Sequence, residues 1–206
     1  RNFALLLVPL TLAACGGTTT PAPTPTPVPV PVPNRTFSEL ENSADDLENK
    51  YATVAFSDEA QIPLAGSATY DGPFLLDFGR AFNNDENEAA GEGDLAFNFN
   101  RGDALSGTIT DLVREDGTDI TGSISLSNSS IDRSSGTFST SSSQGSVEAN
   151  MSGILRNQEG DTITLSGELE GDFKGPSRQG FIGETAGTIN VNGSRYSWDG
   201  EFYTEQ

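Results

Sequence analysis

TITLSGELEGDFKG, residues 162–175, alternates between two faces and decides the fold. One face carries Ile163, Leu165, Gly167, Leu169, Gly171 and Phe173, and the other carries Thr162, Thr164, Ser166, Glu168, Glu170 and Asp172. Strict period-two alternation over this length predicts a strand that is buried on one side and exposed to water on the other. The glycines fall on the apolar face, which favours a strand that bends around a small closed barrel.

The same alternation recurs along the chain from residue 64 to residue 206. Its apolar or glycine positions are Ala68, Tyr70, Gly72, Phe74, Leu76 and Phe78; Leu95, Phe97 and Phe99; Leu105, Gly107 and Ile109; Ile120, Gly122, Ile124 and Leu126; Val147, Ala149, Met151, Gly153 and Leu155; Gly187, Ile189 and Val191; and Tyr196, Trp198, Gly200 and Phe202. A serine-rich segment from Ser134 to Ser143 is interpreted as a short or frayed strand.

Short turns separate these segments. They are Arg101-Gly102-Asp103, Asp116-Gly117, Glu159-Gly160-Asp161 and Asn192-Gly193, and the last is the strongest hairpin signal in the chain. Consecutive hairpins predict an all-β fold, a single antiparallel up-and-down β-barrel of about eight strands over residues 64–206, because closure hides the strand edges. An open sandwich is the alternative. A transmembrane barrel is disfavoured by glycines in the apolar phase and by the absence of aromatic girdles.

Residues 35–63 are expected to hold one short helix and a connecting segment. Ser38-Glu39-Leu40-Glu41 has the spacing of a capping box. The apolar residues that recur at helical intervals are Phe37, Leu40, Ala44, Leu47 and Tyr51. This stripe is expected to cover one mouth or edge of the barrel, with a partner-binding helix as the alternative.

The first residues predict a lipoprotein address. Residues 1–14 have the basic and apolar regions of a signal peptide, and Leu12, Ala13 and Ala14 precede Cys15 as in the bacterial lipobox. Cys15 is therefore the expected lipidation site, and Gly16 after it favours export to the outer membrane. The rest of 15–34 is proline-rich and is expected to be a disordered polyproline II tether that reaches roughly 50 Å.

Composition excludes several classes of function. The chain has 11 basic against 30 acidic residues and a net charge of −19, so nucleic acid and anionic membrane surfaces are poor partners. It has no histidine, which removes the usual general base and the commonest transition-metal ligand. Serines are abundant, but no nucleophile-elbow motif accompanies them. We therefore expect no enzymatic activity, no cofactor and no metal site.

Four clusters of residues are candidate sites. The loop Asn83–Glu88 has oxygen ligands for calcium, but its spacing favours a solvated acidic loop. Glu168, Glu170 and Asp172 share one strand face and are interpreted as solubilising charges rather than an acid–base pair. Arg101-Gly102-Asp103 is interpreted as turn chemistry rather than an adhesion motif. The aromatic residues expected in the core, with ligand stacking at a barrel mouth as the alternative, are Tyr196, Trp198 and Phe202.

The segments GDFKGP at 171–176 and GETAGT at 183–188 resemble the ending of transferrin-binding protein B-like β-barrel domains. Residues 68–72 and 105–109 are similar to that family's early strands. The residues that match the family motif are Gly171, Phe173, Gly175, Pro176, Gly183 and Gly187. The resemblance implies an eight-stranded barrel on a surface lipoprotein of a Gram-negative bacterium, a family in which some members bind host iron carriers, haem carriers or complement regulators.

This chain departs from the two-lobed receptors of that family, because it has room for one barrel only and carries Lys174 where they prefer tyrosine. The resulting hypothesis is a monomeric, lipid-anchored outer-membrane lipoprotein whose barrel binds a host or environmental macromolecule at the cell surface. An iron or haem carrier is one such ligand. A structural or accessory envelope lipoprotein is the alternative. A lipocalin-like carrier needs a hollow barrel, which the bulky inward set of Phe97, Phe99, Phe173 and Trp198 disfavours.

Overall fold

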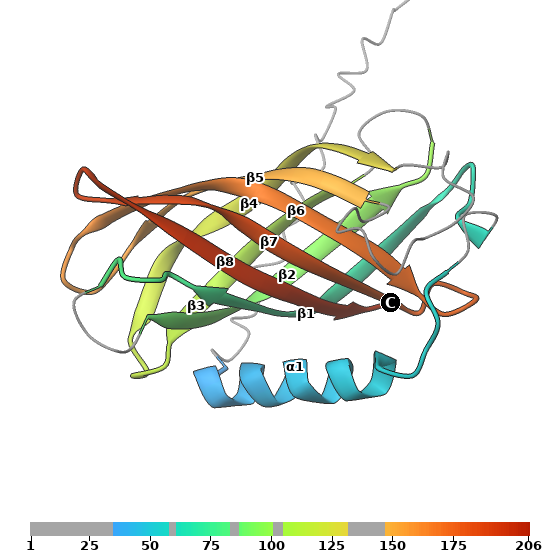
Figure 1. Ribbon diagram of the computed structural model, residues 1–206, viewed down its shortest axis with the longest axis horizontal. Coiled ribbons are helices and arrows are strands. Elements are labelled where there is room, and N and C mark those ends of the chain that lie inside the picture. The colour runs from blue at the N-terminus through green and yellow to red at the C-terminus, as the bar shows by residue number, and fades with distance from the viewer. Residues whose placement is uncertain (1–34, 58–60, 83–86, 101–104, 132–146) are drawn as a thin grey trace, which may run out of the picture. The chain divides into compact units, whose positions relative to one another are not determined.

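The computed structural model describes residues 35–57, 61–82, 87–100, 105–131 and 147–206. Within these ranges the chain forms one helix and eight strands: α1 (Phe37–Tyr51), β1 (Ser67–Asp77), β2 (Glu88–Asn98), β3 (Leu105–Arg114), β4 (Asp119–Ile131), β5 (Val147–Arg156), β6 (Thr162–Lys174), β7 (Gly180–Val191) and β8 (Ser194–Glu205). Each strand pairs antiparallel with the next, and β8 pairs back to β1 (Figure 1). The predicted up-and-down barrel is confirmed, and the sandwich alternative is wrong.

Several expectations lie outside the described residues. These are the signal peptide, the lipobox with Cys15, the proline-rich tether, the turn 101–103 and the serine-rich segment 134–143.

The hairpin turns have the backbone geometry that their sequences predict. Asn192 and Gly193 both have positive φ, at 50° and 91°, as a two-residue type I′ turn requires. Gly117 and Gly160 also have positive φ, at 82° and 87°, where they connect β3 to β4 and β5 to β6. These turns fix the register of the three hairpins.

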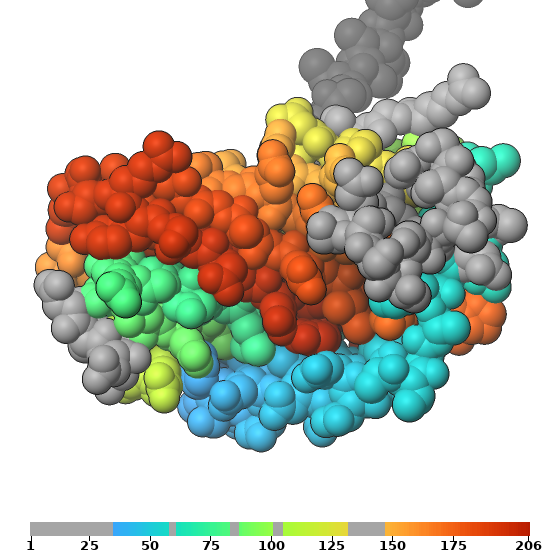
Figure 2. Space-filling view, viewed as in Figure 1, coloured from blue at the N-terminus to red at the C-terminus, as the bar shows by residue number. Residues whose placement is uncertain are grey.

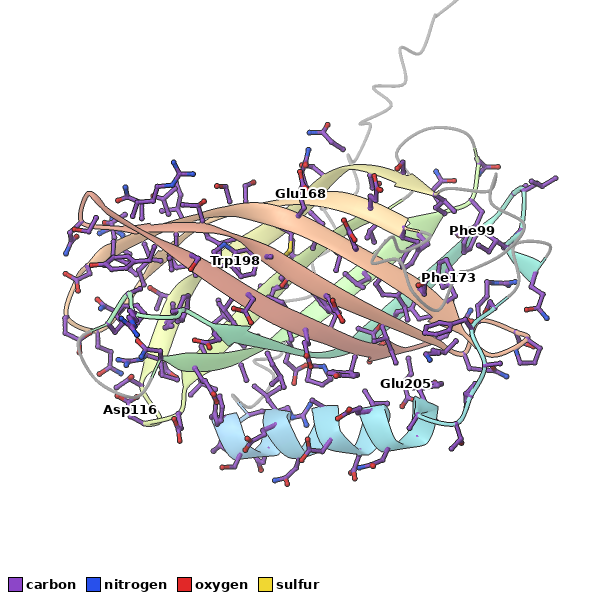
Figure 3. The ribbon with its side chains drawn as sticks, viewed as in Figure 1. Phe99, Asp116, Glu168, Phe173, Trp198 and Glu205 are labelled. Atoms are coloured by element: carbon purple, nitrogen blue, oxygen red, sulfur yellow. The ribbon has the colours of Figure 1, made fainter. Side chains whose placement is uncertain are left out.

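Apolar side chains fill the interior of the barrel. An aromatic cluster surrounds Phe97, whose ring centroid lies 4.8 Å from that of Phe173 and 5.0 Å from that of Phe181. Phe99, which directly follows β2, and Phe173 of β6 lie near the same end of the barrel, whereas Trp198 lies farther along it (Figure 3). All of these side chains are buried. The predicted core positions of Trp198 and Phe202 are confirmed, and Tyr196 packs against the core while partly exposed.

Pairs of inward glycines make room for these rings. Gly167 of β6 pairs with Gly187 of β7, and the indole of Trp198 packs against both. The backbone approaches so closely that Trp198 Nε1 donates a hydrogen bond to the carbonyl of Ser166, at 3.2 Å. The prediction that these glycines face the interior is confirmed here, because a Cβ at either glycine would overlap the backbone of the neighbouring strand.

Two further glycine pairs repeat this arrangement. Gly171 pairs with Gly183 under the ring of Phe181, and Gly93, paired with Gly72, faces the ring of Phe202. The prediction is wrong at Gly122, which is exposed and has a φ of 115°. The pairing of β3 with β4 shifts register there, so the inward phase is broken at that residue.

Bulges also explain why two strands are longer than their alternation predicts. The pairing of β2 with β3 shifts register between Ala90 and Glu92, opposite Asp111, which has a φ of 52°. Beyond this point Leu112 continues the interior face, while Val113 faces outward and packs under α1. In β3, the regular alternation of buried and exposed residues therefore ends after Ile109, although the strand itself continues to Arg114.

Helix α1 has its N-cap two positions before the predicted one, at Thr36 instead of Ser38. Thr36 is the N-cap: its backbone N–H donates to Glu39 Oε2 at 2.8 Å, and the N–H of Glu39 donates to Thr36 Oγ1 at 3.3 Å. The backbone N–H of Thr36, and then its hydroxyl, which also donates to Glu39 Oε2 at 2.9 Å, lower the pKa of the Glu39 carboxyl. Ser38 is already inside the helix, so the capping box expected at residues 38–41 is wrong.

The helix covers the outer wall of the barrel and not a mouth, contrary to the prediction. Its buried stripe is the predicted one: Phe37, Leu40, Ala44, Leu47 and Tyr51. The first part packs against Ala90 and Val113, and the last part packs against Tyr203. The ring of Tyr51 occupies the space beside Gly180, and its hydroxyl donates to the carbonyl of Gln179 at 2.9 Å. A closed barrel has no free edge, so the stripe is buried against the wall.

The connection that follows α1 lies against the end of the barrel where β6 turns into β7. The N–H of Ser57 donates to the carbonyl of Phe173, and the N–H of Gly175 donates to the carbonyl of Ala55, each at 2.9 Å. The ammonium of Lys174 lies 3.4 Å from the centroid of the Phe56 ring, and burial lowers its pKa. Ile62 reaches the main core. This segment, and not the helix, therefore covers one end of the barrel.

We expect Gly187→Ala to lower the free energy of unfolding by about 1–3 kcal/mol, because the added methyl would lie 2.1 Å from the Ser166 carbonyl oxygen. Ala186→Val, one residue away on the outward face, should change it by less than about 0.5 kcal/mol. Urea denaturation of both variants measures the difference. Equal losses would contradict the inward placement of Gly187.

Two buried threonines provide a second test. The hydroxyl of Thr185 has no hydrogen-bond partner among the described residues, whereas Thr204 Oγ1 donates to the carbonyl of Phe181 at 3.0 Å. Thr185→Val should raise the free energy of unfolding by about 1 kcal/mol, and Thr204→Val should lower it by about 1 kcal/mol. Denaturant titration checks both; the same sign for both variants would contradict these hydrogen-bond assignments.

Candidate functional site

Carboxylates form two neighbouring rows across the outer wall of the barrel. The first row runs through paired positions on five strands: Glu88 (β2), Asp77 (β1), Asp199 (β8), Ala186 (β7) and Glu168 (β6). The second row runs beside it: Leu75 (β1), Glu201 (β8), Glu184 (β7), Glu170 (β6) and Glu148 (β5). We call the two rows together the acidic band.

Strand register brings these groups together. Neighbouring strands lie about 4.8 Å apart, and side chains at i and i+2 share a face, so each carboxylate has close acidic neighbours along and across the strands. Like charges directly opposite each other destabilise a sheet. Glu184 is opposite Glu170 on one side and Glu201 on the other, so the four acidic members of the second row form an unbroken series of repulsive pairs.

Three carboxyls of the band have a raised pKa, first because of partial burial and then because of neighbouring carboxylates. Partial burial, followed by the charges of Glu148, Glu168 and Glu184, raises the pKa of Glu170. Partial burial, followed by Asp77 and Glu201, raises the pKa of Asp199. Glu88 also has a raised pKa, chiefly from partial burial and then from Glu115, Asp77 and Glu41.

Two hollows lie at the non-acidic members of the two rows. The larger, about 390 Å³, surrounds Ala186 between β6, β7 and β8. The smaller, about 230 Å³, has apolar walls from Phe37, Leu75 and Ala89, and we call it the helix hollow. Both hollows are lined by Asp199, Gly200 and Glu201, so they adjoin.

Basic side chains do not compensate this surface. No lysine or arginine of the described ranges lines either hollow. Near α1, Arg35 is paired with Glu92 at 3.2 Å, and Lys50 is paired with Glu205. Figure 2 views this face, where the blue helix lies directly against the strands. The band therefore presents net negative charge next to an apolar hollow.

The predicted carboxylate face on β6 is only part of the band. Glu168 and Glu170 belong to it as predicted residues of one face, but their acidic neighbours on β1, β7 and β8 were not identified from the sequence. Asp172 lies farther along β6, opposite Ile182. The missed signal was the register of the Asn192-Gly193 hairpin, which by itself places Glu184 opposite Glu201.

The residues of the family motif have structural positions. Gly171 and Phe173 face the interior from β6, and on β7 Gly183 lies opposite Gly171 while Gly187 lies opposite Gly167. Gly175, with a φ of 80°, and Pro176 lie in the turn between those strands. Each of these positions is explained by turn geometry or core packing.

In the part of the chain that the structure describes, no three potential ligand residues are arranged to hold a metal ion. The loop 83–88 is described only at Asn87 and Glu88, and Glu88 begins β2.

No protein family, curated protein or solved structure matches the chain. No helix in the part of the chain that the structure describes has the length and apolar character needed to cross a bilayer. The resemblance to transferrin-binding protein B-like domains therefore stays a prediction from sequence.

The acidic band predicts a stability that rises as the pH falls from about 7 toward the ordinary glutamate pKa of 4.5. Carboxyls with a pKa raised in the folded state bind protons more tightly there than in the unfolded chain, so lower pH favours folding. Thermal melts across this range measure the effect.

The double variant Glu170→Gln with Asp199→Asn should be more stable than the wild type at about pH 7, and its stability should rise less on acidification. Asp94→Asn with Asp119→Asn makes the same charge change outside the band and should keep the wild-type slope. Equal slopes in all three proteins would contradict a contribution from the band.

Proposed function

We propose that the chain is a non-enzymatic, lipid-anchored outer-membrane lipoprotein whose barrel binds a host or environmental macromolecule at the cell surface. The sequence Leu12-Ala13-Ala14-Cys15 supports the anchor, and the proline-rich segment after it supports a domain held away from the membrane. A structural or accessory envelope lipoprotein remains the alternative function.

One structural observation carries the binding role: the interior is packed and the outer wall carries an uncompensated acidic band. A lipocalin-like carrier needs an enclosed space for a ligand. Here that space is filled by buried rings, including Phe97, Phe173 and Trp198. Binding is therefore assigned to the outside of the barrel, where carboxylates and hollows lie together.

The anchor is tested by Cys15→Ser in the precursor, expressed in a Gram-negative host and fed labelled palmitate. We expect the wild type to be labelled and to fractionate with the outer membrane, and the variant to be unlabelled and released in soluble form. Thr18→Ser is the control outside the lipobox and should behave like the wild type. An unlabelled wild type would contradict lipidation at Cys15.

Surface exposure and ligand capture are tested on the same cells. Protease added to intact cells should remove the barrel. Untreated cells should retain a protein from serum or from metal- and haem-loaded carriers, and protease-treated cells should not. Cleavage only after lysis, without capture, would contradict the surface role and favour the accessory envelope function.

A further inference from the structure

We propose that the acidic band and the helix hollow together form a docking groove for an extended, lysine- or arginine-rich polypeptide segment that carries apolar side chains. This inference names the class of partner, and so it rests on the binding role proposed above. The apolar hollow takes a side chain of the partner, and the carboxylate rows take its cations.

The helix hollow supplies the apolar part of the groove. Its walls come from three elements, with Phe37 from α1, Leu75 from β1 and Ala89 from β2. At about 230 Å³ it is smaller than the roughly 300–1,000 Å³ of most small-molecule pockets. It therefore fits a single protruding side chain better than a whole cofactor or drug-sized ligand.

Carboxylates surround this apolar floor. Glu41, Asp77, Glu88, Asp199 and Glu201 all line the helix hollow, and no described lysine or arginine does. A partner that places an apolar group on the floor must therefore place its neighbouring groups among anions. Lysine and arginine side chains meet both demands, because their aliphatic stems cover apolar surface while their charged ends reach the carboxylates.

The two hollows continue into each other, which favours an extended partner. They share Asp199, Gly200 and Glu201 of β8, and the first acidic row spans β2 to β6. With strands about 4.8 Å apart, four steps along the row cover roughly 19 Å. About six residues of extended chain have that length at roughly 3.3 Å per residue.

Charge excludes the other candidate occupants. A second copy of this chain carries the same net charge of −19 and the same band, and nucleic acid and anionic lipid are also repelled. The segment 18–34 of this chain contains no charged residue. A cationic partner is favoured, because its positive charges neutralise carboxylates that repel one another across β6, β7 and β8.

The test is binding of fluorescent Lys-Leu-Lys-Ser-Lys-Leu-Lys-Ser to the purified chain, measured by anisotropy at low and physiological salt. We expect saturable binding that weakens with salt. Glu184→Gln with Glu201→Gln should weaken it roughly tenfold, and Asp94→Asn with Asp119→Asn, of equal net charge, should stay within about twofold. Equal weakening in both double variants would overturn the proposal, since it would reduce binding to general charge attraction.

The shape of the groove is tested by separate changes to each partner. A peptide with serine in place of leucine should bind more weakly, and Ala186→Arg, which places a cation inside the larger hollow, should abolish binding. Circular dichroism and thermal melts confirm that the variants fold. Equal affinity for the serine peptide, or equally tight binding of spermine, would overturn the proposal of an apolar-plus-cationic polypeptide.

This experiment needs neither a membrane nor cells. Failure of the peptide to bind would therefore overturn the proposed docking groove. It would not contradict lipidation at Cys15 or capture of another macromolecule, which the experiments on cells test separately.

Discussion

The structure depends on close approach between strands at paired inward glycines. At Gly167 and Gly187 the backbones of β6 and β7 come near enough for Trp198 to pack against both and for its indole N–H to reach the Ser166 carbonyl. A side chain at either glycine would displace the ring or open the sheet. Closure of the barrel and filling of its interior therefore depend on each other, because the aromatic rings occupy the space that the glycines leave.

A filled barrel moves any binding function to its outer surface. At one end the β3–β4, β5–β6 and β7–β8 turns are short. At the other end the connection after α1 is hydrogen-bonded to the start of the β6–β7 turn. On the long outer wall, strand register decides which outward side chains lie next to one another. There, the alternation that hides apolar residues also aligns Glu148, Glu170, Glu184 and Glu201 across four strands. Tight core packing and the acidic band are consequences of the same pairing.

Helix α1 links the core to this surface. Its stripe from Phe37 to Tyr51 covers apolar residues on the outer wall that the barrel interior cannot take, such as Ala90 and Val113. Its N-terminal half also supplies Phe37 and Glu41 to the helix hollow. The bulge at Asp111 matters here, because it turns Val113 outward under the helix. A local register shift therefore contributes to both the seat of the helix and the groove beside it.

The sequence by itself determined the alternation, the inward aromatics, the helix and the hairpin at Asn192-Gly193, because these depend on local periodicity and turn chemistry. It also placed Glu168 and Glu170 on one outward face. The sequence predicted a closed barrel as well. Tertiary structure decided the register in which β8 closes on β1, the bulge at Asp111 and the position of α1 on the wall, since none of these follows from neighbouring residues. The band joins Asp77 to Asp199 only through that closure, which pairs strands at opposite ends of the barrel sequence.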